Sequence, residues 1–278
     1  MNSSQVKVME AVKRRYWGLM MVGLLLALTL LGLFFTPYDP NAVNIAARFQ
    51  PPDREHLLGT DHFGRDVLSR ILWGARISLA VGIAAVCLGA AAGVFLGSAA
   101  GFFGGWWDEL LMRLSTALQA LPSILLALLF AAVWSPGVPV VLWGIALGNI
   151  PSFLRVTRNQ VLSIKERPYV EAARALGAGD LRIVLRHIFP NLRDALLVQF
   201  SVSLAGAILA EASLSYLGVG IQPPDPSWGR MLREAQPYGS LAPWLVLVPG
   251  LFIAFAVVGF NLLGDTWILG RERVYKGE

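Results

Sequence analysis

The chain has 278 residues, of which 55% are hydrophobic and only 15% are charged, and its mean hydropathy is +0.59. Soluble globular domains carry about 25% charged residues, so this composition excludes an ordinary soluble domain and indicates a membrane protein. The net charge of +5 fits either nucleic-acid binding or a topological role of the cations in a membrane. Cys87 is the single cysteine and lies in an apolar run, which excludes an internal disulfide framework and favours inert packing.

Apolar segments long enough to cross a membrane recur along the chain. A transmembrane helix needs about 20 mostly apolar residues. We predict six such helices, over residues 17–36, 77–103, 110–134, 139–158, 194–217 and 241–265. The turn-forming stretch Ser135-Pro136-Gly137-Val138-Pro139 separates the third from the fourth. The first follows Lys13-Arg14-Arg15 as a signal peptide would, but its apolar run exceeds the usual roughly 7 to 15 residues, so we predict a retained anchor.

The positions of the lysine and arginine residues predict the orientation. Six spans place both termini on the same side, and 16 of the 23 Lys and Arg residues fall there, most of them in the N-terminal tail 1–16 and between Arg155 and Arg193. Cytoplasmic segments carry such an excess, so we expect both termini (tails 1–16 and 268–278) and the loop 159–193 in the cytoplasm. Residues 37–75 and 218–240 are then extracytoplasmic. The cations need no nucleic acid to explain them.

A glycine stripe marks the second predicted helix. Gly89, Gly93, Gly97 and Gly101 recur every fourth residue and therefore share one face. Small residues at this spacing let helix backbones approach closely. We favour packing within the chain, with a subunit interface or a pore-lining face as the alternatives.

Residues 167–191, RPYVEAARALGAGDLRIVLRHIFPN, are unusually polar for this chain. Pro168 suits the first turn of a helix, Gly177 suits the residue just past its end, and Asp180 suits the N-cap of a second helix. On the second helix one apolar face is predicted, made of Leu181, Val184, Leu185 and Ile188. Pro190 is expected to end that helix before the fifth span. The apolar face could lie on the membrane, beneath the chain's own spans, or in a groove of a soluble partner.

Four stretches carry a family resemblance. Glu171-Ala172-Ala173, followed by Gly177 and then by Pro190 thirteen residues later, resembles the EAA loop of permeases from binding-protein-dependent, ATP-driven importers. The stretches HLLGTDHFGRDVLSRILWGARISL (56–79), LAEASLSYLGVGIQPPDPSWGRML (209–232) and FNLLGD (260–265) resemble the dipeptide, oligopeptide and nickel branch. His187 stands where the loop usually has isoleucine. The tail TWILGRERVYKGE departs from the family's ending, so no role is carried over to it.

The resemblance implies the permease of a type I ABC importer: an all-α polytopic membrane protein with six spans, a core over residues 76–267 and a cytoplasmic coupling helix-turn-helix. It implies a bacterial inner-membrane location and four partners: a second homologous permease subunit, two cytoplasmic ATPase subunits and an extracytoplasmic solute-binding protein. ATP and Mg would be bound by the ATPase subunits, and we expect no cofactor in this chain. The residues implied for ATPase coupling are Tyr169, Glu171, Ala172, Ala173, Leu176, Gly177, Asp180, Arg182, Arg186, His187 and Pro190.

Enzyme motifs are missing from the sequence. It contains no GxxxxGK[ST], no HExxH and no GxSxG, so we predict a subunit that performs no bond chemistry. Dipeptides or oligopeptides are the predicted cargo, and nickel or a metal chelate is the alternative. A stand-alone channel or secondary transporter is the alternative from another class, although no internal repeat is evident.

Two further places could contribute to the translocation path. Glu211 lies inside the fifth predicted span, where an ionisable side chain either faces the path or braces neighbouring groups, and we favour the brace. Asp225 and Trp228 belong to the rigid outer loop QPPDPSWG, which could gate the path, contact the binding protein or simply pack.

Histidines and carboxylates gather in the segment GTDHFGRD and just before it. His56, Asp61, His62 and Asp66 are residue types that bind metals, and imidazole suits nickel. The stretch is equally typical of a turn followed by a helix cap. We therefore predict no metal site there.

Overall fold

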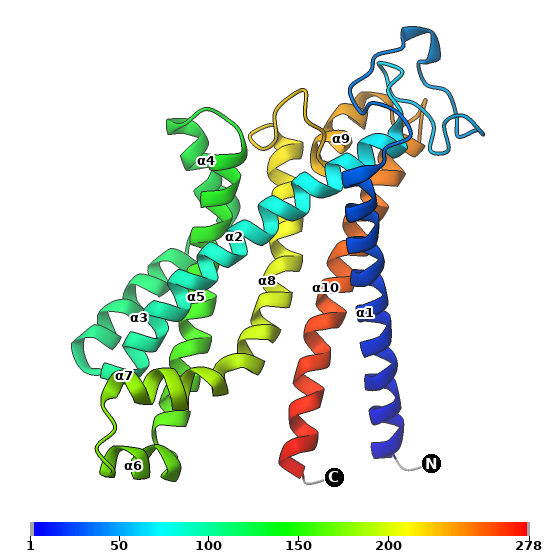
Figure 1. Cartoon of the computed structure of the whole chain (residues 1–278). Coiled ribbons are helices and arrows are strands. Elements are labelled where there is room, and N and C mark those ends of the chain that lie inside the picture. The colour runs from blue at the N-terminus through cyan, green and yellow to red at the C-terminus, as the bar shows by residue number, and fades with distance from the viewer. Residues whose placement is uncertain (1–2, 277–278) are drawn as a thin grey trace.

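The structure is a computed structural model that describes the backbone of residues 3–276 and the side chains of residues 16–265. Its long elements are helices: α1 (Ser3–Phe34), α2 (Val67–Phe103), α3 (Gly105–Gln119), α4 (Ser123–Val133), α5 (Val138–Lys165), α8 (Phe189–Leu217) and α10 (Trp244–Lys276). Short ones are α6 (Pro168–Ala175), α7 (Asp180–Ile183), a π turn (Val184–Ile188) and α9 (Trp228–Ala235). Figure 1 shows the resulting helical bundle, which confirms the predicted all-α fold.

Five helical segments in the described part of the chain are long and apolar enough to cross a membrane. They are Tyr16–Phe34, Val67–Phe103, Val138–Lys165, Asp180–Leu217 and Trp244–Asp265. The helices α3 and α4 qualify only as a pair, and the pair is bent by 82°. The predicted count of six spans is met if this bent pair counts as one.

The bend contradicts the continuous helix predicted over 110–134. Pro122 precedes α4, and its carbonyl accepts the N–H groups of Leu125 and Leu126 as the first acceptor of the new helix. Proline disfavours the helical conformation in the residue before it, so α3 ends near Gln119. Apolar composition alone predicted the length of this region but missed the interruption.

The other helices extend beyond the predicted membrane segments. Residues 67–75, assigned above to the outer segment, form the first turns of α2, and α5 continues to Lys165. The helix α1 begins at Ser3 and α10 reaches Lys276, so most of the backbone of both predicted tails is helical. The side chains of tails 1–16 and 268–278, apart from Tyr16, lie outside the described residues. Apolar runs predict the membrane-spanning part of each helix. The helices extend beyond these runs where the flanking residues also favour the helical conformation.

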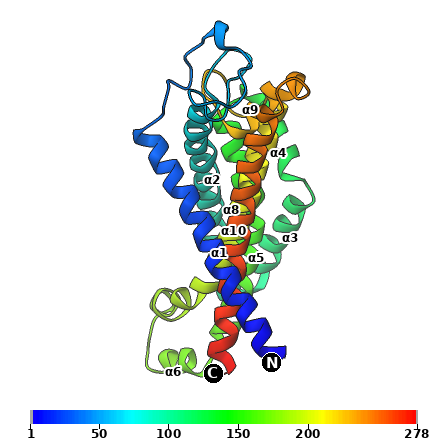
Figure 2. The same cartoon turned by 90° about the vertical axis from the view of Figure 1, so that its right-hand side faces the viewer.

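The two ends of the bundle differ in content. Both chain termini and the helices α6 and α7 lie at one end, while residues 35–66 and α9 lie at the other, and the two views agree (Figures 1 and 2). We refer to these as the inner end and the outer end, after the orientation predicted from the sequence. α1 packs along α10, and α8 packs against both α5 and α10.

The glycine stripe of α2 packs against α5 of the same chain. A Cβ atom added at Gly93 would lie 2.6 Å from Phe153 Cβ, and one at Gly97 would lie 2.5 Å from the carbonyl oxygen of Leu154. Gly89 and Gly101 meet the backbone of α5 in the same way. This finding confirms the favoured alternative, packing within the chain. The contact joins the long helix α2 to the helix that leads into α6.

Candidate functional site

The polar stretch at the inner end forms two short helices and a π turn between α5 and α8. We name residues 166–192 the coupling element. α6 ends as predicted at Gly177, whose φ of +83° lies in the left-handed region that glycine tolerates best. The N–H of Ala178 bonds to the carbonyl of Ala173, and the N–H of Gly177 bonds to that of Arg174. This pair of bonds is the Schellman motif, which reverses the chain toward α7.

A small hydrophobic cluster fixes the coupling element to α5. Its members are Val161, Ile164, Val170, Ile183, Ile188 and Leu192, and each is buried. Val161 and Ile164 belong to α5, Val170 to α6, and Leu192 to α8. The coupling element is therefore tied to both long helices that flank it, and we call these six residues the anchor cluster.

The predicted apolar face of the second helix is partly wrong. Ile188 is buried, but Leu181 and Leu185 are 73% and 59% exposed, and Ile183 is buried in their place. The prediction assumed an uninterrupted α-helix, whereas Val184–Ile188 forms a π turn that changes which residues share a face. Leu176, at the end of α6, is 88% exposed. Three leucines of the coupling element thus point away from the protein.

Two further expectations about this element are corrected. Asp180 is not the N-cap of the second helix, because Gly179 holds that position and α7 starts at Asp180 itself. An acidic residue in the first turn still complements the helix dipole. Pro190 does not end the helix, because it lies in the first turn of α8 and the preceding π turn accommodates it.

The remaining predicted coupling residues mostly face outward. Glu171, Ala172, Arg182 and Arg186 are exposed, and Ala173 is half-buried. Tyr169 from α6 and His187 from the π turn lie with their ring centroids 6.4 Å apart. The structure therefore brings α6 close to the π turn, and the exposed side chains of the coupling element are both charged and apolar.

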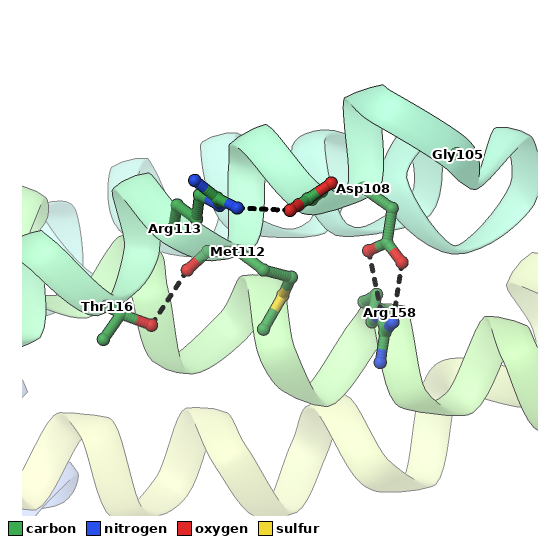
Figure 3. A pocket seen from close by; sticks show the side chains of 7 residues that line it. Gly105, Asp108, Met112, Arg113, Thr116 and Arg158 are labelled. Carbon is green, nitrogen blue, oxygen red and sulfur yellow. Dashed lines mark hydrogen bonds and ion pairs between the residues drawn. The ribbon is translucent and has the colours of Figure 1, made fainter.

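A pocket of about 540 Å³, lined by charged as well as apolar groups, lies between α3 and α5. Figure 3 shows Asp108 facing Arg158 across it, with distances of 2.9 Å from Nε to Oδ1 and 2.6 Å from Nη2 to Oδ2. Glu109 pairs with Arg113 on the same helix. Both carboxylates of the pocket are thus neutralised by arginines, and the bidentate Asp108–Arg158 pair links the start of the bent α3–α4 pair to α5.

An ionic cluster dominates the outer end, with Glu234 of α9 at its centre. Glu234 Oε2 accepts hydrogen bonds from Arg65 at 2.8 Å and Arg70 at 3.0 Å, and its Oε1 accepts one from Arg230 at 2.9 Å. Asp61 binds Arg65 through Oδ2 at 2.7 Å. We call these five residues the outer ionic cluster, and it joins the segment before α2, α2 itself and α9.

His62 lies beside this cluster. Ligand atoms of Asp61, His62 and Glu234 all fall within 4.8 Å of one another, as a metal site would require. However, both carboxylates already bind arginines, and three guanidinium groups next to a cation would repel it. Burial lowers the pKa of His62 below its usual 6.5, and Arg65 and Arg70 lower it further, against the opposite effects of Asp61 and Glu234. His56 turns away to contact Asp66.

Glu211 is fully buried at the junction of α8, α2 and the outer loop. Its Oε1 accepts a hydrogen bond from Ser215 at 2.8 Å, and the Ser78 and Ser227 side chains also face the carboxyl group. Its Oε2 has no hydrogen-bond partner among the described residues. Ser215 in turn accepts the N–H of Ile221, so the carboxyl group supports the start of the outer loop. This geometry favours the brace over contact with cargo.

Trp228 and Asp225 occupy different environments in the outer loop. Trp228 is fully buried, its indole N–H donates to the carbonyl of Ile71 at 3.2 Å, and its ring lies 6.0 Å from that of Phe252. Asp225 is exposed. Within this chain Trp228 is therefore positioned to fix α9 to α2, and only Asp225 of the two presents its side chain to a partner.

The outer ionic cluster was not predicted from the sequence. Arg230 and Glu234 stand four residues apart, a spacing that signals a helical ion pair, but Arg65 and Arg70 are more than 160 residues away. Nothing in the local pattern shows that these distant charges meet. The cluster forms because α9 packs beside the start of α2.

The fold defines a class of protein: a helical membrane protein with several apolar spans and a short helical element anchored at one end of its bundle. Comparisons with known proteins identify that class. Residues 93–269 match the family described as "Binding-protein-dependent transport system inner membrane component". The chain belongs to this family and is a non-catalytic permease subunit of a type I ABC importer.

Individual relatives support the assignment. The chain is 43% identical over 243 residues to the glutathione transport system permease protein GsiD of Escherichia coli O6:K15:H31 (strain 536 / UPEC). The match covers 87% of this chain and 80% of the relative, and GsiD of Shigella boydii serotype 4 (strain Sb227) gives the same values. Two structures of inward-facing conformations of the MetNI methionine ABC transporter share the fold, with TM-scores of 0.58 and 0.59 and 18% identity. They cover 69% and 70% of this chain and 91% and 93% of theirs.

Family membership implies the general partners. Such permeases act in the inner membrane with an ATPase and a solute-binding protein. The prediction of an importer permease is therefore confirmed.

Proposed function

We propose that the chain forms half of the translocation pathway for peptides and that its coupling element docks on a cytoplasmic ATPase. The observation that carries the docking proposal is the exposure of Leu176, Leu181 and Leu185 on an element whose other face is buried in the anchor cluster. Exposed leucines on an element that is anchored through its other face are typical of an interaction surface. Arginines beside them supply charge for orientation.

The anchor cluster explains how docking would move the membrane helices. Ile183 and Ile188 pack with residues of α5 on one side and with Leu192 of α8 on the other. A partner that displaces the coupling element therefore displaces α5 and α8 together. The partner's two nucleotide states must bind the coupling element differently, because only differential affinity shifts a conformational equilibrium.

The proposed assembly has a second homologous permease, two ATPase subunits and an extracytoplasmic binding protein. The inner end, which carries both termini, would lie in the cytoplasm, and the excess of Lys and Arg residues on that side supports this orientation. The outer end, with Asp225 exposed in its loop, would face the binding protein.

The cargo proposal rests on the relatives. Both reported permeases are named for glutathione, which is a tripeptide, and peptide cargo fits the sequence resemblance as well. Competition for uptake between labelled dipeptide, glutathione and nickel in cells that express the complete importer tests the proposal. Competition by the peptides alone supports it, and competition by nickel alone supports the alternative, a nickel importer.

Docking is tested with Leu181→Ala and Leu185→Ala in the complete importer. Truncation of a central apolar contact costs about 1–3 kcal/mol, so the ATPase affinity should fall about fivefold or more. Leu209→Ala is the matched control, because this leucine is 53% exposed in the middle of α8, far from the coupling element. Unchanged ATPase binding in both coupling variants would contradict the proposal.

A further inference from the structure

The π turn Val184–Ile188 interrupts what would otherwise be one α-helix from Asp180 to Leu217. In this turn the N–H of Phe189 bonds to the carbonyl of Val184, five residues back, where an α-helix would bond four residues back. One residue more than usual is thereby taken into the turn. As a consequence, the side chains of α7 are rotated about the helix axis relative to those of α8, and we call this rotation a change of phase.

Burial of the anchor residues reveals the phase change. Ile183 and Ile188 are both buried in the anchor cluster, although they are five residues apart. In an α-helix five residues turn through about 500°, which would leave these side chains about 140° apart. The five-residue bonding of the π turn brings them back to one face. Leu192, four residues after Ile188, then continues that face in regular α-helical spacing.

Two residues after the turn explain why it forms. Pro190 has no N–H to give to the carbonyl of Arg186, and in an α-helix its ring would clash with that carbonyl. Asn191 follows, and its side-chain amide donates to the carbonyl of His187 at 2.7 Å. This side-chain bond gives a residue of the π turn a hydrogen-bond donor from the first turn of α8.

We propose that Val184–Ile188 is a phase-setting turn, held by Pro190 and Asn191 as positioning residues, that determines which side chains the coupling element presents outward. Each residue of an α-helix turns through about 100°. Without the π turn, which takes in one extra residue, α7 would therefore be rotated by about 100° relative to α8. Leu181 and Leu185 would then turn toward the protein and Ile183 would turn toward solvent. The functional meaning of this inference rests on the proposed ATPase docking, but the phase itself does not.

Cysteine accessibility measures the phase directly. In a Cys87→Ser chain expressed in membranes without the other subunits, single cysteines are placed at residues 181–189, 191 and 192 and treated with a water-soluble thiol reagent. We expect protection at 183, 188 and 192 and rapid reaction at 181 and 185. Protection at 181 and 185 together with 188, the pattern of an uninterrupted α-helix, would overturn the proposal.

The positioning role is tested in the same assay. Pro190→Ala combined with Asn191→Leu removes both the steric cause of the turn and the substitute donor, so a cysteine at residue 183 should become reactive. Pro190→Ala combined with Asn191→Gln keeps an amide donor and should retain more of the protection. An unchanged pattern in the first variant would show that these residues do not hold the turn.

A pair of deletions tests the phase independently of docking, in the same cysteine assay. In a Pro190→Ala chain, deletion of Arg186 leaves residues 183 and 188 four positions apart, about 40° in an α-helix, so both stay on the buried face. Deletion of Ala195, in regular α-helix, rotates everything before it relative to the rest of α8. We expect a cysteine at residue 183 to stay protected after the first deletion and to become reactive after the second. Equal reactivity after both deletions would refute the phase-setting turn.

The outcomes separate this inference from the proposed function. If the wild-type chain shows the 183, 188, 192 pattern but captures no ATPase in the complete importer, docking fails and the phase-setting turn stands. If it captures ATPase with the uninterrupted α-helical pattern, docking stands and the turn fails.

Discussion

The inner and outer ends of this permease are held together by different forces. At the inner end the coupling element is attached by the six apolar residues of the anchor cluster and leaves three leucines exposed. At the outer end five charged residues bind one another around Glu234, and Trp228 and Glu211 are fully buried beside them. The inner end therefore exposes apolar side chains, whereas the charges of the outer ionic cluster bind one another within the chain.

The difference indicates that the two ends have different roles, transmission of movement at the inner end and stability at the outer end. Apolar contacts are non-directional, so the anchor cluster can transmit displacement while keeping its members buried. Buried ion pairs depend on geometry, and breaking one leaves a desolvated charge behind. We expect mutations at the outer end to affect the stability of the fold and mutations at the inner end to affect communication with a partner.

The largest effect is expected from Glu234→Ala. The substitution leaves Arg65, Arg70 and Arg230 without their shared carboxylate, and Arg70 is almost completely buried. Loss of one partner from a buried pair costs about 3–5 kcal/mol, so thermal unfolding in detergent should occur at a clearly lower temperature. Glu109→Ala is the control, because its pair with Arg113 is exposed and should contribute less than about 1 kcal/mol. Similar effects of the two variants would contradict the central role of the outer ionic cluster.

Gly177→Val is expected to have the next largest effect, on the coupling of ATP hydrolysis to uptake more than on the stability of the fold. A branched side chain at a φ of +83° costs at least about 1–2 kcal/mol and distorts the turn between α6 and α7. ATP hydrolysis by the assembled importer should continue while uptake falls, measured on the same proteoliposomes. Gly179→Val is the matched control, since Gly179 has a φ of −67° and no atom near an added Cβ. Full transport by Gly177→Val would refute the coupling element as a lever.

The coupling element also shows how far local sequence rules extend. Gly177 and Pro168 were assigned correctly, because left-handed turns and first helical turns restrict residue types locally. The apolar face over Leu181 and Leu185 was assigned wrongly, because counting in steps of 3.6 assumes an uninterrupted helix. Pro190 was the available signal, but it was interpreted as a helix end when the chain continues through a π turn.

A smaller effect is expected from Glu211→Gln. The amide has nearly the shape of the carboxyl group and keeps an oxygen for Ser215, so thermal stability should change by less than about 1.5 kcal/mol. If Glu211 is a brace, uptake of cationic and neutral peptides should be affected equally, measured as a ratio of initial rates. A selective loss of cationic peptides would instead place Glu211 on the path of the cargo.

The outer end illustrates what sequence reasoning lacks. Glu211 was recognised because a carboxylate inside an apolar run is conspicuous, and the helical spacing of Arg230 and Glu234 was available in the same way. That Arg65 and Arg70 reach Glu234 depends on how α9 packs against the start of α2. Long-range contacts of this kind come from tertiary packing. The bend between α3 and α4 has instead a local cause, Pro122, which apolar composition alone does not reveal.

The smallest effect is expected from protonation of His62, and it would sharpen the contrast between the two ends. Burial holds the pKa of this histidine below its unfolded value of 6.5, so the unfolded chain binds more protons near that pH. The histidine's contribution to stability is complete above about pH 6.5 and decreases as the pH falls toward the lower folded pKa. Proteolysis of residues 37–66 in detergent should therefore accelerate between about pH 7.5 and about pH 5. His62→Phe, which keeps a ring against Tyr238, should reduce this acceleration, whereas His187→Phe at the inner end should leave it intact. Equal acceleration in all three proteins would contradict the role of His62 in the acid sensitivity.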